Sequence, residues 1–191
     1  MRYDKGHKDE TRRRILDVAS AQFRESGIAA IGLAGIMSEA GLTNGAFYTH
    51  FASKEDLVRE VLMDALTRRE ERHKANLENG VAVETVIRDY LSTRHRDRAD
   101  TGCPTAALVA EIARHPKATR DAFTGKISDI IALMAEQIRQ GSAAERRRKA
   151  ITIYSTMVGA LQLARAVNDK QLSAEILENA VETAIAIANE R

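Results

Sequence analysis

Residues 33–51, LAGIMSEAGLTNGAFYTHF, decide the fold. Two short helical patterns flank the turn Gly41-Leu42-Thr43, where the glycine supplies the backbone freedom that a sharp angle between helices requires. A helix this short is unstable alone and has to be held by packing. The apolar positions fall on one side and are expected to face a core: Ile36, Ala40, Leu42, Phe47 and Phe51.

The second half of this stretch, residues 44–51, predicts a helix with a polar outer side. Thr43 stands where a helix-capping residue is expected. Asn side chains bond adenine edges in the major groove, and small residues let the backbone approach the bases. Hydroxyl and imidazole groups suit phosphate oxygens. The candidate DNA-contacting residues are therefore Thr43, Asn44, Gly45, Ala46, Tyr48, Thr49 and His50.

Apolar residues at helical spacing continue through the rest of the chain, and glycine or proline separates the segments. We predict an all-α fold of about nine helices and no strands. We expect a three-helix DNA-binding domain over residues 1–53 and a helical effector-binding and dimerisation domain over residues 54–191. The predicted helices cover residues 9–26, 33–40, 44–51, 54–78, 82–95, 104–114, 117–139, 143–167 and 171–188.

Lys54 is the last candidate for DNA contact. The run Ser53-Lys54-Glu55-Asp56 resembles a capping box, which places Lys54 in the first turn of a helix. A positive charge there opposes the helix dipole. Beside free N–H groups it would form an anion site, which predicts a clamp on a DNA phosphate. The alternative is a solvated lysine, with Glu55 and Asp56 offsetting the dipole.

Taken together, residues 11–57 resemble the DNA-binding domain of the TetR family of transcriptional regulators. The resemblance implies that residues 43–50 enter the major groove, that Asn44, Gly45 and Ala46 face bases, and that Tyr48, His50 and Lys54 contact the DNA backbone. It also implies a homodimer. The matching residues are Thr11-Arg12-Arg13-Arg14-Ile15-Leu16, Phe23, Gly41-Leu42-Thr43, Phe47-Tyr48, His50-Phe51 and Ser53-Lys54-Glu55-Asp56-Leu57.

Three positions depart from the family pattern. Gly32 replaces the usual capping Ser or Thr, Gly35 replaces a common acidic residue, and Asn44 replaces a frequent basic one. Gly35 is expected to weaken its helix by roughly 1 kcal/mol relative to alanine. These departures leave one alternative function open, a helical ligand-binding protein that has lost DNA binding.

Composition excludes other classes. The chain has 191 residues, 44% hydrophobic and 29% charged, which is ordinary for a globular protein. Residues 1–24 hold seven Lys/Arg against four Asp/Glu, so the amino-terminal end is mildly basic. No apolar run reaches the roughly 18 residues of a membrane span, and we expect no secretory leader and a cytoplasmic protein. We find no catalytic constellation, metal-ligand spacing or cofactor fingerprint, and so predict no enzyme and no cofactor.

The last two predicted helices are apolar on more than one face. One face can serve the protomer core, while a second would stay in water unless a partner covers it. We therefore expect a homodimer in which these helices pair as a four-helix bundle. The alternative is burial within a monomer. Small residues are expected to allow close helix approach: Ala160, Ala164, Ala180 and Ala184.

Cys103 is the only cysteine. Pro104 suits the first position of a helix, which places the thiol at a helix N-terminus and lowers its pKa. The Gly102-Cys103 lead resembles TetR-type regulators that sense oxidants or electrophiles through one cysteine; the alternative is an inert thiol. Three upstream arginines are expected to add positive potential: Arg94, Arg96 and Arg98.

The resulting hypothesis is a sequence-specific DNA-binding regulator. We expect a repressor released from a palindromic operator by a small-molecule effector or by modification of Cys103. An effector would be enclosed by apolar residues for which the sequence favours plain core over ligand contact: Met63, Leu66, Ile87, Tyr90, Leu91, Leu108, Phe123, Ile127, Ile130 and Met134.

Overall fold

The computed structural model describes residues 5–190 and contains ten helices and no strand within that range. The predicted all-α fold is confirmed, with one helix more than expected. The helices are α1 (Lys5–Ser26), α2 (Leu33–Glu39), α3 (Asn44–Phe47), α4 (Lys54–Glu78), α5 (Val83–Tyr90), α6 (Thr93–Asp97), α7 (Pro104–Ile112), α8 (Lys117–Gln137), α9 (Ala143–Ala166) and α10 (Lys170–Asn189).

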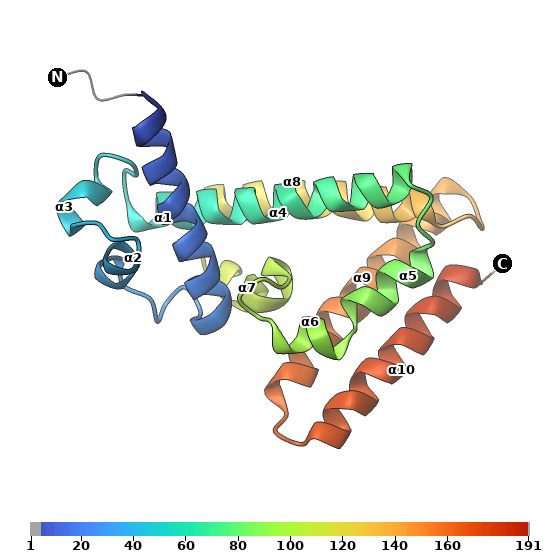
Figure 1. The fold of residues 1–191 in the computed structure, drawn as a ribbon. Coiled ribbons are helices and arrows are strands. Elements are labelled where there is room, and N and C mark those ends of the chain that lie inside the picture. Colours follow the sequence, from blue (N-terminus) through green and yellow to red (C-terminus); the bar gives the residue numbers. More distant parts are fainter. Residues whose placement is uncertain (1–4, 191) are drawn as a thin grey trace.

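Helices α1, α2 and α3 form a head at one end of the molecule (Figure 1). Helix α1 packs against α2, and α2 packs against α3. The turn between α2 and α3 passes through Gly41 at φ 67°, a backbone conformation that favours glycine. Ile36 and Phe47 join Phe23 of α1 in the buried cluster. The predicted helix-turn-helix core is therefore present.

The remaining helices form a larger body (Figure 1). Helix α4 leaves the head and lies beside α8, while α9 and α10 pack against each other. Helix α7 contacts both α1 and α9, so it lies between head and body. The buried apolar residues belong to one cluster that includes side chains from α1 through to α10. Head and body thus share a core.

The additional helix arises where one helix was predicted over residues 82–95. The helix is interrupted before Ser92, whose backbone is extended (φ −82°, ψ 152°). Its hydroxyl accepts a hydrogen bond from the N–H of His95 at 3.2 Å and donates one to the carbonyl of Asp89 at 2.8 Å. Side-chain capping of this kind competes with helix continuation, and α6 begins after Ser92 as a separate element.

Helix α3 is shorter than the predicted 44–51. Beyond Phe47 the chain continues in tight turns, with the N–H of Thr49 bonded to the carbonyl of Ala46 at 3.2 Å and the N–H of His50 bonded to Phe47 at 2.9 Å. The rings of Phe47 and Phe51 stack with centroids 5.5 Å apart. Both rings remain buried, so they still anchor this segment in the core although the helix is shorter than predicted.

Phe47 and Tyr48 are adjacent aromatic residues in opposite environments, 1% and 70% exposed. We expect Phe47→Ala to lower the free energy of unfolding by about 3–5 kcal/mol, because it removes a buried ring and leaves a cavity. Tyr48→Ala is the matched control and should change it by less than about 0.5 kcal/mol. Urea unfolding followed by circular dichroism measures both; equal losses would contradict this assignment.

Candidate nucleic-acid interface

Helix α3 and the turns around it present the predicted DNA-contacting residues to solvent. The exposed members are Thr43, Asn44, Gly45, Tyr48 and Thr49, and the half-buried ones are Ala46 and His50. The buried rings of Phe47 and Phe51 anchor this segment in the core. Its exposed side is therefore held in place before any DNA is bound. The structure brings these residues together on the head, and their contact with DNA remains a prediction.

The capping residues differ in what their hydroxyls do. Thr43 occupies the N-cap of α3, yet its side chain makes no capping hydrogen bond. Ser53 caps α4 and accepts from the N–H of Asp56 at 3.1 Å. The carboxylate of Asp56 accepts from the N–H of Ala52 at 3.1 Å, so the return bond of the predicted box reaches one residue further back. The hydroxyl of Thr43 is left for an external partner.

His50 is surrounded by positive charge. Its pKa is lowered by partial burial and by the charges of Lys8 and Arg12 on α1, so near neutral pH it is a neutral donor. The guanidinium of Arg12 also lies over the ring of Phe51, 5.0 Å from its centroid. Sequence reasoning did not select Lys8 or Arg12. The signal was the basic amino-terminal stretch, which only the fold places beside α3.

Lys54 lies at the start of α4, as predicted, but its ammonium is already engaged. It donates to the carbonyl oxygen of Ile28 at 2.8 Å, and Lys54 is half-buried. It lines a cleft with Glu55, Glu111 and His115. This geometry gives Lys54 a second role, holding the segment after α1 against α4, in addition to the proposed phosphate contact.

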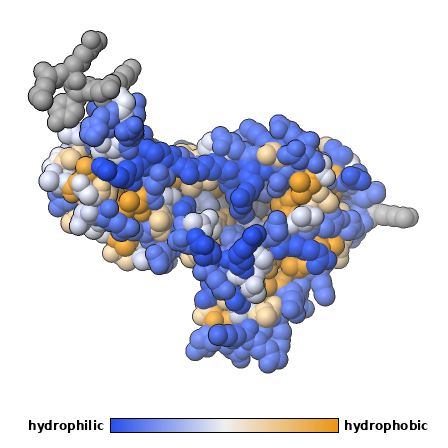
Figure 2. Space-filling model, in the orientation of Figure 1, coloured by the Kyte–Doolittle hydropathy of each residue, from blue (hydrophilic) through white to orange (hydrophobic). Residues whose placement is uncertain are grey.

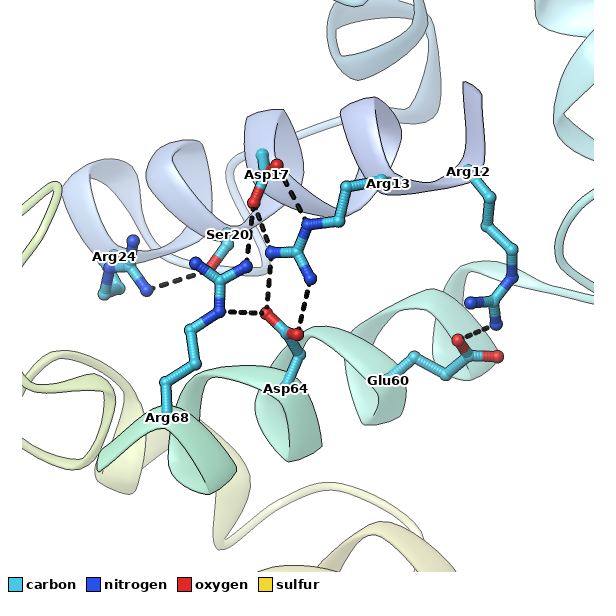
Figure 3. A network of polar contacts seen from close by, with 8 residues as sticks. All are labelled: Arg12, Arg13, Asp17, Ser20, Arg24, Glu60, Asp64 and Arg68. Atoms are coloured by element: carbon cyan, nitrogen blue, oxygen red, sulfur yellow. Dashed lines mark hydrogen bonds and ion pairs between the residues drawn. The ribbon is translucent and has the colours of Figure 1, made fainter. Parts of the chain in front are cut away.

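A charged network joins α1 to α4 (Figure 3). The guanidinium of Arg13 reaches Asp64 at 2.6 Å and also pairs with Asp17 on its own helix. Arg68 contacts both of those carboxylates from α4, at 3.2 Å to Asp17 and 3.1 Å to Asp64. These contacts fix the direction of α1 relative to α4. The members are Arg12, Arg13 and Asp17 from α1 and Glu60, Asp64 and Arg68 from α4.

The end of α1 is also tied to α7. The carboxylate of Glu111 accepts hydrogen bonds from the backbone N–H groups of Ile28 at 3.1 Å and Ala29 at 2.9 Å. Gly27 has φ 85°, and a Cβ there would lie 2.7 Å from the carboxylate of Glu111. The positive φ favours glycine at this position, and a side chain there would displace the Glu111 carboxylate. The head is therefore held by α7 as well as by α4.

Cys103 occupies the N-cap of α7 and is completely buried. Burial opposes its ionisation, but the charge of Arg69, the nearby hydroxyl of Tyr90 and the backbone N–H groups at the start of α7 together lower its pKa. Among charged groups, the main contribution comes from Arg69 on α4.

The expectation that the upstream arginines supply the potential around Cys103 is corrected by the structure. Arg96 pairs with Asp97 at 2.7 Å, and Arg98 pairs with Asp100 at 3.2 Å. An arginine paired with a carboxylate adds little net charge to its surroundings. The guanidinium that lowers the pKa of Cys103 is that of Arg69, which precedes Cys103 by more than thirty positions and lies on α4, a helix that packs against α7.

A helix-turn-helix head with an exposed third helix, joined to a larger helical body, defines a DNA-binding regulator. A family model described as "Bacterial regulatory proteins, tetR family" matches residues 15–61. A second, "Tetracyclin repressor-like, C-terminal domain", matches residues 82–180, which is more than half of the chain. The chain belongs to the TetR family of bacterial transcriptional regulators. Its relatives are regulators, which confirms the prediction that it is not an enzyme.

Curated relatives match mainly the amino-terminal part. The transcriptional regulator AcrR of Shigella flexneri is 43% identical over 60 residues, 31% of this chain and 28% of the relative. The transcriptional repressor KstR2 of Mycobacterium tuberculosis is 40% identical over 96 residues, 50% of this chain and 37% of the relative. The matched segments span less than half the length of either relative.

Solved structures match over nearly the whole chain. A TetR regulator from Chloroflexus aurantiacus has a TM-score of 0.77 and 26% identity, covering 96% of each chain. The reduced form of NemR from Escherichia coli has a TM-score of 0.76 and 23% identity, covering 92% of this chain and 95% of NemR. Within the described residues, no helix is both long and apolar enough to span a lipid bilayer.

Proposed function

We propose that this chain is a repressor that binds a palindromic operator as a dimer and leaves it when an effector acts on the body. The observation that carries the proposal is that the α3 segment has a buried side and an exposed side. Phe47, the last residue of α3, is 1% exposed, and Tyr48, which follows it, is 70% exposed. We assign DNA binding to residues 1–53 and effector binding with dimerisation to residues 54–191. Chromosomal DNA as the partner places the protein in the cytoplasm.

The roles within the head follow from exposure and chemistry. Asn44, with Gly45 and Ala46 beside it, forms the end of α3 that meets base edges in the major groove. Around this end lie the groups that meet phosphate oxygens, namely Thr43, Tyr48, Thr49, His50 and Lys54. Lys8 and Arg12 add positive charge on the side of α1.

The test is fluorescence anisotropy with a labelled duplex from immediately upstream of the gene, at several salt concentrations. We expect nanomolar, salt-sensitive binding. Tyr48→Ala should weaken it about tenfold or more through the lost phosphate contact, since each 1.4 kcal/mol is a factor of ten. Lys54→Ala should also weaken it.

The salt dependence separates the two roles of Lys54. A direct phosphate contact predicts that Lys54→Ala lowers the slope of log affinity against log salt by about one per contact. A purely structural role, through the carbonyl of Ile28, predicts weaker binding with an unchanged slope. Binding no tighter than to random DNA, both for this duplex and in a genome-wide selection of bound fragments, would overturn the DNA-binding proposal and favour a ligand-binding protein.

TetR regulators act as dimers, and we propose that α9 and α10 form the interface. Ile151 and Leu163 on α9 are 43% and 58% exposed, and Leu172 on α10 is 44% exposed. Such side chains on two helices packed against each other leave an apolar outer face for a second copy. The small residues that we expected to allow close helix approach do not line this face, because they are buried within the protomer: Ala160, Ala164, Ala180 and Ala184.

We expect Leu163→Arg to dissociate the dimer, because the substitution places a charge at the centre of an apolar contact. Ser128→Arg, which adds the same charge at an exposed position on α8, should leave the dimer intact. Sedimentation velocity at micromolar concentration distinguishes monomer from dimer. A dimer that survives Leu163→Arg places the interface elsewhere.

Release from DNA follows from how the head is held. Helix α7 contacts the head through Glu111, as described, and the loop before α7 contacts it through the carbonyl of Asp100, which accepts from Arg24 at 2.6 Å. Helix α4 begins at the head and extends into the body. An effector that shifts α4 or α7 changes the spacing of the two heads and breaks their match to successive major grooves. Effector and operator then oppose each other's binding reciprocally.

Modification of Cys103 is a second trigger, favoured by its lowered pKa at the start of α7. Because the thiol is completely buried, iodoacetamide reaches it only through local opening of the fold. We expect slow labelling with an apparent pKa below the ordinary value of about 8.5. Arg69→Gln should raise that apparent pKa, because it removes the charge that stabilises the thiolate. Labelling rates against pH, read by mass spectrometry, provide the measurement. An apparent pKa equal to that of free cysteine in both proteins would mark the thiol as inert.

A further inference from the structure

The body contains a cavity of about 570 Å³ beneath α4, between α5, α6 and the segment before α7. The space-filling view shows a hollow in this region bordered by strongly hydrophilic side chains (Figure 2). Of the apolar residues predicted to enclose an effector, only Tyr90 lines it; the others belong to the core or pack against it. The lining includes Arg69, Arg72 and His73 from α4, Tyr90 from α5, and Arg94 and His95 from α6.

The cavity carries a large excess of positive charge. Arg98 also lines it but is paired with Asp100. The other three guanidinium groups, those of Arg69, Arg72 and Arg94, face a single lining carboxylate, that of Asp89. The two histidines do not add to this charge at neutral pH. The pKa of each is lowered to about 4, by burial first; the guanidinium groups of Arg69 and Arg72 lower both further.

Several of these groups have no partner in the described part of the chain. Arg72 and Arg94 make no ion pair among the residues that the structure describes. Nε of Arg69 and Nδ1 of His73 are buried without a hydrogen-bond partner there, and His73 is only 4% exposed. Buried polar groups are normally satisfied, so Nε of Arg69, which can only donate, indicates a missing acceptor; Nδ1 of His73 lacks a partner of either kind.

We propose that this cavity binds the effector and that the effector is a small molecule with at least two anionic groups, carboxylate or phosphate. Guanidinium groups form paired, charge-assisted hydrogen bonds with both. The volume suits a small metabolite, and Val86 with the ring of Tyr90 supplies an apolar wall. This inference rests on the proposed function and adds the chemical class of its effector.

The location connects the cavity to the head. Arg69 and Arg72 belong to α4, whose first turn lies at the DNA-reading end. Thr101 and Gly102 line the cavity immediately before α7, the helix that holds the segment after α1. An anion that draws α6 towards α4 therefore acts on both elements that position the head. DNA binding and anion binding are expected to oppose each other.

Isothermal titration calorimetry on the full-length protein tests the proposal with two probes, pyrophosphate and citrate, at constant ionic strength set with potassium chloride. We expect the wild type to bind at least one of them, and Arg72→Gln with Arg94→Gln to weaken that binding at least tenfold. Arg147→Gln with Arg148→Gln, which changes two exposed arginines on α9 that do not line the cavity, is the charge-matched control and should bind like the wild type. Circular dichroism confirms that all variants fold.

The pattern of binding identifies the source of the anion. Pyrophosphate alone points to a phosphorylated effector, and citrate alone to a polycarboxylate. No binding of either probe, or binding that is unchanged in the double variant, overturns the proposal. Operator binding measured without anions tests the regulator function separately, so a protein that binds DNA but neither probe refutes only the effector class.

Discussion

The position of the DNA-reading helix depends on the ion pairs between α1 and α4. Helix α3 is too short to hold its own direction, so it follows the core that it shares with α1. The pairs Arg13–Asp64 and Arg68–Asp17 cross from α1 to α4 and fix one helix on the other. Individual surface ion pairs contribute little to stability, typically below about 1 kcal/mol. Their contribution here is orientation, whereas the shared apolar cluster supplies most of the folding free energy.

Much of this architecture could be predicted from local patterns. Gly41 marks the turn, Ser53 marks the start of α4, and apolar spacing marks the long helices, because each signal acts within a few residues. The break at Ser92 was missed because Ser is common in continuous helices, and only its bonds to Asp89 and His95 show it acting as a cap.

The sites were harder to predict than the elements. Exposure of Tyr48 and burial of Phe47 followed from the pattern, but the bond from Lys54 to Ile28 requires two segments that meet only in three dimensions. The charged cavity was missed for the same reason, because its residues come from segments that meet only in the folded structure. Arg69 and Arg72 share one face of α4, and Arg94 comes from a separate helix. A search for apolar residues around an effector selected the core, because the cavity is lined mainly by charged and polar side chains.

In the proposed complex, the short α3 and the turns after it limit how much of the DNA one head reads. A single small module buries little surface on DNA, so most of the affinity must come from joining two heads in one molecule. Below the concentration at which protomers pair, operator occupancy then rises with the square of the amount of protein. Cellular abundance of the chain thus becomes a control variable in its own right, alongside any effector.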